Sequence, residues 1–245
     1  MSAVIYPTTN LAATEQLKFD RGEGVYVYDQ NGKQYLEGMA GLWCTGLGYG
    51  NRELIDTISE QLSKLSFTHT FGGKTHQPVI DLGNKLAEMV PVDNAMVFFG
   101  NSGSDANDSH MKMLRYYFNA IGRPEKRKII TRDRAYHGVT VAAGSLTSLP
   151  ANLAHFDAPL DALGILRTDH PHYYRGAQGD ETEAQFVDRI THNLETLILA
   201  EGPETIAAFI AEPITGASGV IVPPAGYYEK VQAILDKYDL SLIHI

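Results

Sequence analysis

The 245-residue chain contains a single cysteine, Cys44, so an internal disulfide is excluded. A chain without disulfides suits a reducing compartment, and we expect a cytoplasmic protein. Free cysteine is among the most buried residue types, so we expect Cys44 to be a small buried side chain rather than a nucleophile.

Long apolar runs and an excess of positive charge are also missing. No apolar stretch is long enough to cross a bilayer, and the N-terminus lacks the basic and apolar regions of a signal peptide. Lys and Arg number 20 against 29 Asp and Glu, which gives a net charge of −9. We therefore expect neither nucleic acid nor a membrane surface as the main partner.

The histidines do not have the spacing of a metal site. His69 and His76 are seven positions apart, and His170 and His172 flank a proline. Neither spacing puts two ligands on one helical face, and no carboxylate or cysteine completes a set. We expect no bound metal and interpret these side chains as solvated loop residues.

What the chain does have is a regular alternation of secondary structure. Aromatic and β-branched residues around an Asn-Gly pair predict a β-hairpin over 24–37. Beyond it, strands alternate with helices, which predicts the α/β class, a mainly parallel sheet with helices on both faces. We expect strands at 96–99, 128–131, 206–211 and 240–245, helices at 53–65, 79–90, 105–119, 139–146, 184–200 and 225–238, and a long functional or mobile loop at 150–180.

The segment MVFFGNSGSDAN at 96–107 carries the strongest chemical signal. A short apolar run meets a Gly/Ser loop that opens a helix, and free N–H groups at a helix N-terminus bind phosphate. The loop is not a P-loop, because no Gly-Lys-Ser/Thr follows, and it is not a dinucleotide fingerprint. A tight strand-to-helix turn with Ser104 as its N-cap is the alternative interpretation.

Two later positions favour the phosphate interpretation. Tyr136 and His137 follow the strand expected at 128–131, and Glu212 ends the strand expected at 206–211. Ligands of parallel α/β sheets bind at the carboxyl ends of strands. A phosphate cradle, an aromatic ring and an acid at successive strand ends suit a small aromatic phosphate ester.

These residues resemble the class III aminotransferases, which bind pyridoxal 5′-phosphate (PLP) on the large domain of fold type I. The matching segments are GLWCTGLGYGN, VFFGNSGSDAN, AYHG and AEPITGASGVIVPPAGYYEKV, in family order. The segment at 41–44 is most similar to the ω-amino acid and amine:pyruvate transaminases. The resemblance implies that 1–45 belong to the small domain and 46–245 to an incomplete PLP-binding large domain.

The resemblance also assigns roles to the cofactor side of the site. It implies that Ser102, Gly103 and Ser104 bind the PLP phosphate, that Tyr136 stacks on the pyridine ring, that His137 shapes the ring pocket, and that Glu212 lies near the cofactor on the substrate side. Simpler roles stay open, namely a core aromatic for the tyrosine, a structural histidine, and a buried acid satisfied by backbone N–H groups.

Trp43 and Phe71 match positions that line the substrate channel in the family. Phe71 would reach across a dimer interface, so the resemblance implies a homodimer. Ordinary apolar packing is the alternative for both side chains.

The implied activity is transfer of an amino group from an ω-amino acid or amine to pyruvate or another 2-oxo acid through PLP. A PLP-dependent aminomutase or racemase of the same fold and a non-catalytic fragment are the alternatives. In the family, the Schiff-base lysine and the aspartate on the pyridine nitrogen lie further along the chain, and the aspartate position falls on Ile245. We therefore expect the chain as given to be an inactive N-terminal portion.

Overall fold

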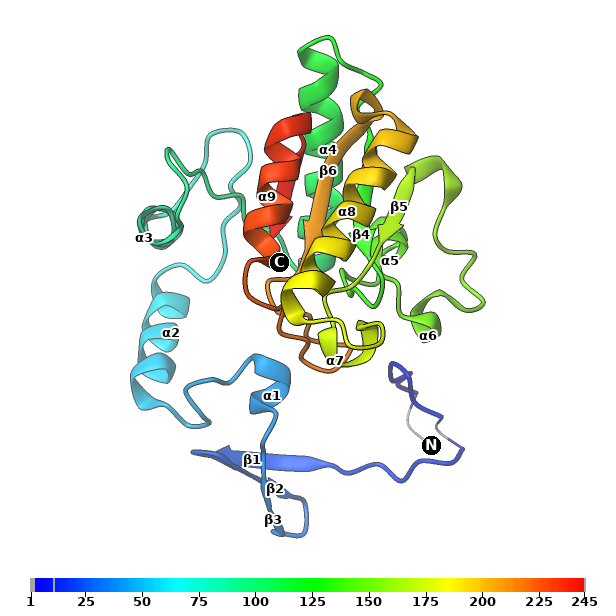
Figure 1. Cartoon of the computed structure of the whole chain (residues 1–245). Coiled ribbons are helices and arrows are strands. Elements are labelled where there is room, and N and C mark those ends of the chain that lie inside the picture. Colours follow the sequence, from blue (N-terminus) through cyan, green and yellow to red (C-terminus); the bar gives the residue numbers. More distant parts are fainter. Residues whose placement is uncertain (1–2, 11, 245) are drawn as a thin grey trace. The chain divides into compact units, whose positions relative to one another are not determined.

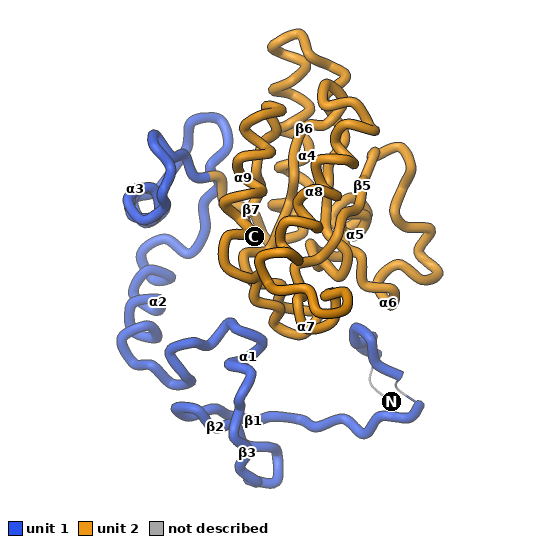
Figure 2. The backbone as a smooth tube through the Cα atoms, viewed as in Figure 1, with its two compact units in different colours: residues 1–97 blue, residues 98–245 orange. Residues whose placement is uncertain are grey.

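The computed structural model describes residues 3–10 and 12–244, so Ile245 lies outside the described residues. The chain separates into two compact units, Met1–Val97 and Phe98–Ile245 (Figure 2). The division expected at 45/46, between a small and a large domain, stays a prediction.

A three-stranded antiparallel sheet opens the first unit (Figure 1). It consists of β1 (Phe19–Glu23), β2 (Tyr26–Asp29) and β3 (Gln34–Leu36). The turn between β2 and β3 is held by Asp29, whose carboxylate accepts hydrogen bonds from the Asn31 and Lys33 N–H groups at 2.8 and 3.0 Å. The predicted hairpin is confirmed, and β1 is an additional strand that the sequence pattern did not reveal.

The helices of the first unit are α1 (Ala40–Trp43), α2 (Arg52–Lys64) and α3 (Gln77–Met89). Asn51 caps α2 by accepting a hydrogen bond from the Leu54 N–H group at 3.1 Å. Val27 is the one buried hydrophobic side chain among the described residues of this unit. Cys44 is exposed, so the expectation of burial is wrong, because the unit gathers almost no core that could receive it.

A four-stranded parallel sheet forms the centre of the second unit, in the order β5-β4-β6-β7. The strands are β4 (Lys128–Arg132), β5 (Ile165–Thr168), β6 (Ile206–Ala211) and β7 (Ser241–His244). The helices are α4 (Gly103–Ala120), α5 (Val141–Leu146), α6 (Pro150–Leu153), α7 (Tyr173–Gly176), α8 (Glu183–Glu201) and α9 (Tyr227–Tyr238), with short 3₁₀ helices η1 (Asp161–Leu163) and η2 (Pro203–Thr205).

Helices cover both faces of this sheet, as predicted (Figure 1). On one face, Ile130 and Phe209 pack with the buried side chains of α8 and α9. On the other face, Ile129 and Ile210 pack with Met111 of α4 and with α5. Alternate residues of β4 and β6 thus face opposite layers, which explains why all six residues of β6 are buried.

One strand prediction and one loop prediction are wrong. Residues 96–99 form no strand, because an extended run becomes a strand only when a neighbour takes its hydrogen bonds, and the four described strands of the sheet pair only with one another. Conversely, the connection at 150–180 is not one long loop and contains β5. That strand has only four residues, includes Arg167 and lies at the sheet edge, so it has no apolar run to reveal it.

Candidate functional site

The predicted phosphate loop runs directly into α4. Ser102 is the N-cap, and its hydroxyl oxygen accepts a hydrogen bond from the Asp105 N–H group at 3.1 Å. In return, the Asp105 carboxylate accepts a hydrogen bond from the Asn101 N–H group at 3.0 Å. The cap is therefore Ser102, and the alternative with Ser104 as N-cap is wrong. Ser104 lies one residue inside the helix.

This capping leaves the N–H groups of Gly103 and Ser104 free to bind an anion, and we call this site the phosphate seat. Among the described residues, the N–H groups of Gly103 and Ser104 have no hydrogen-bond acceptor, as expected for the first turn of a helix. A Cβ atom added to Gly103 would meet nothing within 4 Å, so the space beside this residue is open. The positive end of an 18-residue helix faces that space, and a phosphate group fits these donors.

Ser104 also contacts the loop that follows β4. Its hydroxyl oxygen accepts a hydrogen bond from the Val139 N–H group at 3.0 Å, and its own proton stays available to donate. A Cβ atom on Gly138, where φ is +132°, would lie 2.5 Å from that oxygen. Asn107 donates a side-chain hydrogen bond to the His137 carbonyl at 2.6 Å. The loop can approach α4 this closely only with glycine at 138.

Glu212 joins the same loop from the end of β6. One carboxylate oxygen accepts a hydrogen bond from the Tyr136 N–H group at 3.1 Å, and the other accepts one from the Gly216 N–H group at 2.8 Å. The side chain is buried. The structure thus brings the predicted segments around Ser104, Tyr136 and Glu212 together. Both carboxylate oxygens are satisfied by backbone N–H groups, as the simpler reading of Glu212 expected.

His137 points into the protein and is neutral. Burial, and secondarily the positive charge of Arg132, lowers the pKa of His137 to about 4. The Thr131 hydroxyl donates its one proton to the Leu146 carbonyl at 3.0 Å. The His137 Nε2 atom, 3.1 Å from that hydroxyl oxygen, must therefore carry the proton and donate it. Its Nδ1 atom is then a buried lone pair with no partner among the described residues.

Sequence reasoning missed Arg132, the last residue of β4. Its side chain is fully buried. One guanidinium nitrogen donates to the Glu212 carbonyl at 2.6 Å and to the Thr215 hydroxyl at 3.1 Å, and another donates to the Tyr228 hydroxyl at 3.1 Å. Tyr228 in turn donates to the Glu212 carbonyl at 2.6 Å. An arginine directly after the run Ile129-Ile130-Thr131, at the end of the predicted strand, was the signal available in the sequence.

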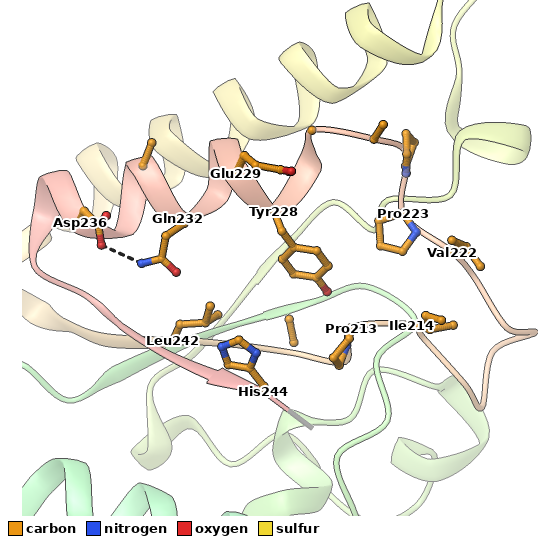
Figure 3. Close-up of a pocket in the computed structure, with 15 residues that line it drawn as sticks. Pro213, Ile214, Val222, Pro223, Tyr228, Glu229, Gln232, Asp236, Leu242 and His244 are labelled. Carbon is orange, nitrogen blue, oxygen red and sulfur yellow. Dashed lines mark hydrogen bonds between the residues drawn. The ribbon is translucent and has the colours of Figure 1, made fainter. Parts of the chain in front are cut away.

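An open pocket of about 810 Å³ lies beside this network, between α9, β7 and the segment at 213–226 (Figure 3). Its lining includes Pro213, Val222, Leu242 and His244, and the Tyr228 ring reaches from α9 toward Pro213. Tyr228 lines the pocket and also donates a hydrogen bond to the Glu212 carbonyl. The pocket therefore borders the hydrogen-bond network of Arg132, Glu212 and Tyr228.

The two predicted channel residues belong to the first unit. Trp43 and Phe71 are 73% and 85% exposed, so neither packs in a core of its own unit. That they lie near Ser104, Tyr136 and Glu212 stays a prediction.

In the described part of the chain, no three His, Cys, Asp or Glu side chains lie close enough together to hold a metal ion. Within the same residues, no helix has the length and apolarity needed to cross a bilayer.

Comparison with known proteins decides the family. The model of the family "Aminotransferase class-III" matches residues 9–244. The chain belongs to the class-III aminotransferases. This class-III chain is 50% identical to an ω-transaminase from Pseudomonas jessenii solved in complex with PMP, with a TM-score of 0.95 over 98% of this chain and 53% of that one. The fold is accordingly that of the fold type I transaminases.

Curated plant relatives match as well. A probable γ-aminobutyrate transaminase 3, mitochondrial, from Oryza sativa subsp. indica is 53% identical over 93% of this chain and 44% of the relative. A γ-aminobutyrate transaminase 3, chloroplastic, from Solanum lycopersicum is 51% identical over 94% and 44%. The class-III chain thus spans about half the length of the relatives it matches.

Proposed function

We propose that the site formed by Ser104, Tyr136 and Glu212 in residues 98–245 binds PLP, and we call it the strand-end site. The N–H groups of Gly103 and Ser104 and the Ser104 hydroxyl, with the N-cap Ser102 holding the turn, receive the phosphate. Tyr136 provides the face on which the pyridine ring stacks. The observation that carries the proposal is the pair of unused N–H groups in front of open space at the start of α4. The PMP complex of the Pseudomonas jessenii relative supports the ligand class.

For the whole protein we propose amino transfer from an ω-amino acid or amine to pyruvate or another 2-oxo acid. The γ-aminobutyrate transaminases among the relatives support an ω-amino acid donor. Bound PLP supplies the electron sink that such a transfer needs. The residues of this chain seat the phosphate, orient the ring and fix Glu212 beside it.

We expect no turnover from these 245 residues alone. Amino transfer through PLP needs a lysine as covalent anchor and proton carrier. Within residues 3–10 and 12–244, no lysine side chain hydrogen-bonds to Ser104, Tyr136, His137 or Glu212. The chain should therefore bind the cofactor without completing the reaction, and added amine and pyruvate should give no alanine.

A homodimer and a cytoplasmic location remain proposals. The exposure of Trp43 and Phe71 supports a partner surface, since large apolar side chains tend to be covered. The plant relatives are named mitochondrial or chloroplastic. Fractionation and the mass of the complete protein in solution would decide both points.

Calorimetric titration of the 245-residue chain with 4-deoxypyridoxine 5′-phosphate tests cofactor binding. This analogue lacks the aldehyde, so it cannot react with exposed lysines. We expect saturable binding, weak or absent binding of unphosphorylated 4-deoxypyridoxine, and an about tenfold loss of affinity in Ser104→Ala, because a hydrogen bond to a charged group contributes about 1.5 kcal/mol.

A matched serine provides the control. Ser241 begins β7, so it lies at the amino end of the sheet, opposite the strand-end site. Ser241→Ala should bind the analogue like the unchanged chain. Equal binding of the phosphorylated and unphosphorylated compounds would refute the phosphate seat.

A further inference from the structure

Arg132 is buried without a carboxylate partner. Its side chain is among the largest fully buried ones, and none of the ion pairs within the described residues includes it. Its guanidinium donates only to neutral oxygens, and its Nε atom has no partner in that part of the chain. Burying a charge in this way is costly, so its hydrogen bonds must be well placed.

The contacts of Arg132 converge on one peptide group. The Glu212 carbonyl accepts from the Arg132 guanidinium and from the Tyr228 hydroxyl, both at 2.6 Å. Hydrogen bonds from charged donors are the stronger kind. The main chain of Glu212 is therefore fixed at the point where β6 ends.

The side chain of Glu212 contacts the loop that follows β4. Its carboxylate accepts from the N–H group of Tyr136, four residues beyond Arg132. The Arg132 side chain, at the end of β4, thus holds the main chain at the end of β6. The Glu212 side chain, at the end of β6, holds the loop that follows β4. We call this reciprocal arrangement of Arg132, Glu212 and Tyr136 the strand-end clasp.

We propose that Arg132 is a positioning residue, which acts through Glu212 to fix the Tyr136 main chain and with it the ring that stacks on the cofactor. The part of this proposal that concerns the cofactor rests on the proposed function. The part that concerns the clasp stands on the contacts alone, so the two can be tested separately.

Amide hydrogen exchange of the ligand-free chain tests the clasp. Arg132→Lys keeps the charge but cannot reach the same three acceptors. We expect the Tyr136 amide to exchange about tenfold faster, since its acceptor is no longer fixed, while the Ile129 and Ile130 amides within β4 keep their rates. Faster exchange of all three amides together would mean a merely structural role and would overturn the proposal.

Two further variants separate the contacts. Tyr228→Phe removes one of the two hydrogen bonds to the Glu212 carbonyl, and Thr215→Val removes one from Arg132 without touching that carbonyl. We expect the first to speed exchange at Tyr136 and the second to change it less than about twofold. If Arg132→Lys does not fold by circular dichroism, Tyr228→Phe decides the same question. An unchanged Tyr136 rate in Tyr228→Phe contradicts the clasp.

The cofactor arm uses the affinity for 4-deoxypyridoxine 5′-phosphate in a double-mutant cycle. As a single substitution, Arg132→Lys should weaken binding about tenfold. In a chain that already carries Glu212→Ala, the same substitution should weaken binding less than about twofold, because the clasp acts through Glu212. An undiminished effect in the Glu212→Ala background would overturn the proposal. Failure of the unchanged chain to bind the analogue would refute the proposed function, and the exchange rates would still decide the clasp.

Discussion

Lowering the pH from 7 to 4 should weaken the fold of residues 98–245, and His137 should account for a separable part of the loss. The imidazole is buried in the loop that follows β4, and its Nε2 atom donates to the Thr131 hydroxyl. Protonation would place a second positive charge near the buried Arg132. His137 therefore binds a proton less readily in the folded state than in the unfolded chain.

The direction and size of the effect follow from this difference. The pKa of His137 is about 4 in the folded protein and 6.5 without the fold. Stability from the neutral imidazole is complete above pH 6.5 and is lost as the pH falls through 6.5 toward 4, where the folded state is also protonated. A difference of about 2.5 in pKa corresponds to about 3 kcal/mol in the free energy of unfolding.

Urea unfolding at pH 7, 6, 5 and 4, followed by far-ultraviolet circular dichroism, measures this loss. Tryptophan fluorescence would not serve, because the one tryptophan, Trp43, lies in the other unit. Burial also lowers the pKa of His110 and of His172. Hydrogen bonds from basic side chains lower the pKa of three carboxyl groups of this unit, Glu181, Glu195 and Asp239. These contributions are common to the unchanged chain and to His137→Asn, so they cancel in the comparison.

The comparison is between His137→Asn and His192→Asn. Asparagine at 137 does not titrate, so the free energy of unfolding should fall by about 3 kcal/mol less between pH 6.5 and 4 than in the unchanged chain, whatever its value at pH 7. His192 is exposed on α8, and its charge is the smallest of the causes that lower the pKa of Glu195, so its replacement should leave nearly all of the dependence intact. An unchanged slope in His137→Asn would refute the assignment of the acid-sensitive step to this imidazole.

Two further predictions concern close contacts of the second unit. Gly138→Ala should cost about 1–3 kcal/mol in urea unfolding and weaken binding of 4-deoxypyridoxine 5′-phosphate, because a Cβ atom there would lie 2.5 Å from the Ser104 hydroxyl oxygen; unchanged stability and affinity would contradict the close approach. Lys126→Met should cost about 1–2 kcal/mol, because the buried Lys126 ammonium donates to the Tyr238 and Asp239 carbonyls at the C-terminus of α9; an equally stable variant would show that this cap contributes nothing.

Much of this fold could be predicted because the signals are local. The run at 206–211 has six apolar residues in a row, and the structure places β6 at those residues with every side chain buried. The Asn-Gly pair at 31–32 likewise indicated its hairpin. Residues 96–99 have the same local signal but no strand partner among the described residues, and no local pattern reports whether a neighbour exists.

The candidate site divides in the same way. Tyr136 and Glu212 were found because they follow the runs that form β4 and β6, and parallel strands gather such residues at one edge. Ser104 was found from the Gly/Ser loop that opens α4, although the run before that loop forms no strand. The clasp could not be foreseen, because it depends on which acceptors a buried arginine meets across two strands. The capping residue was misplaced by two positions, since Ser102 and Ser104 are the same residue type in one loop and only backbone geometry distinguishes them.

The central claim is that an aromatic phosphate ester occupies the seat between α4 and the loop after β4. Amide chemical-shift mapping of the ¹⁵N-labelled chain with 4-deoxypyridoxine 5′-phosphate tests it most directly. The account predicts that the Gly103 and Ser104 amides shift most, with Tyr136 and Val139 next. Shifts confined to the lining of the pocket beside α9, with Gly103 and Ser104 unmoved at saturation, would contradict it.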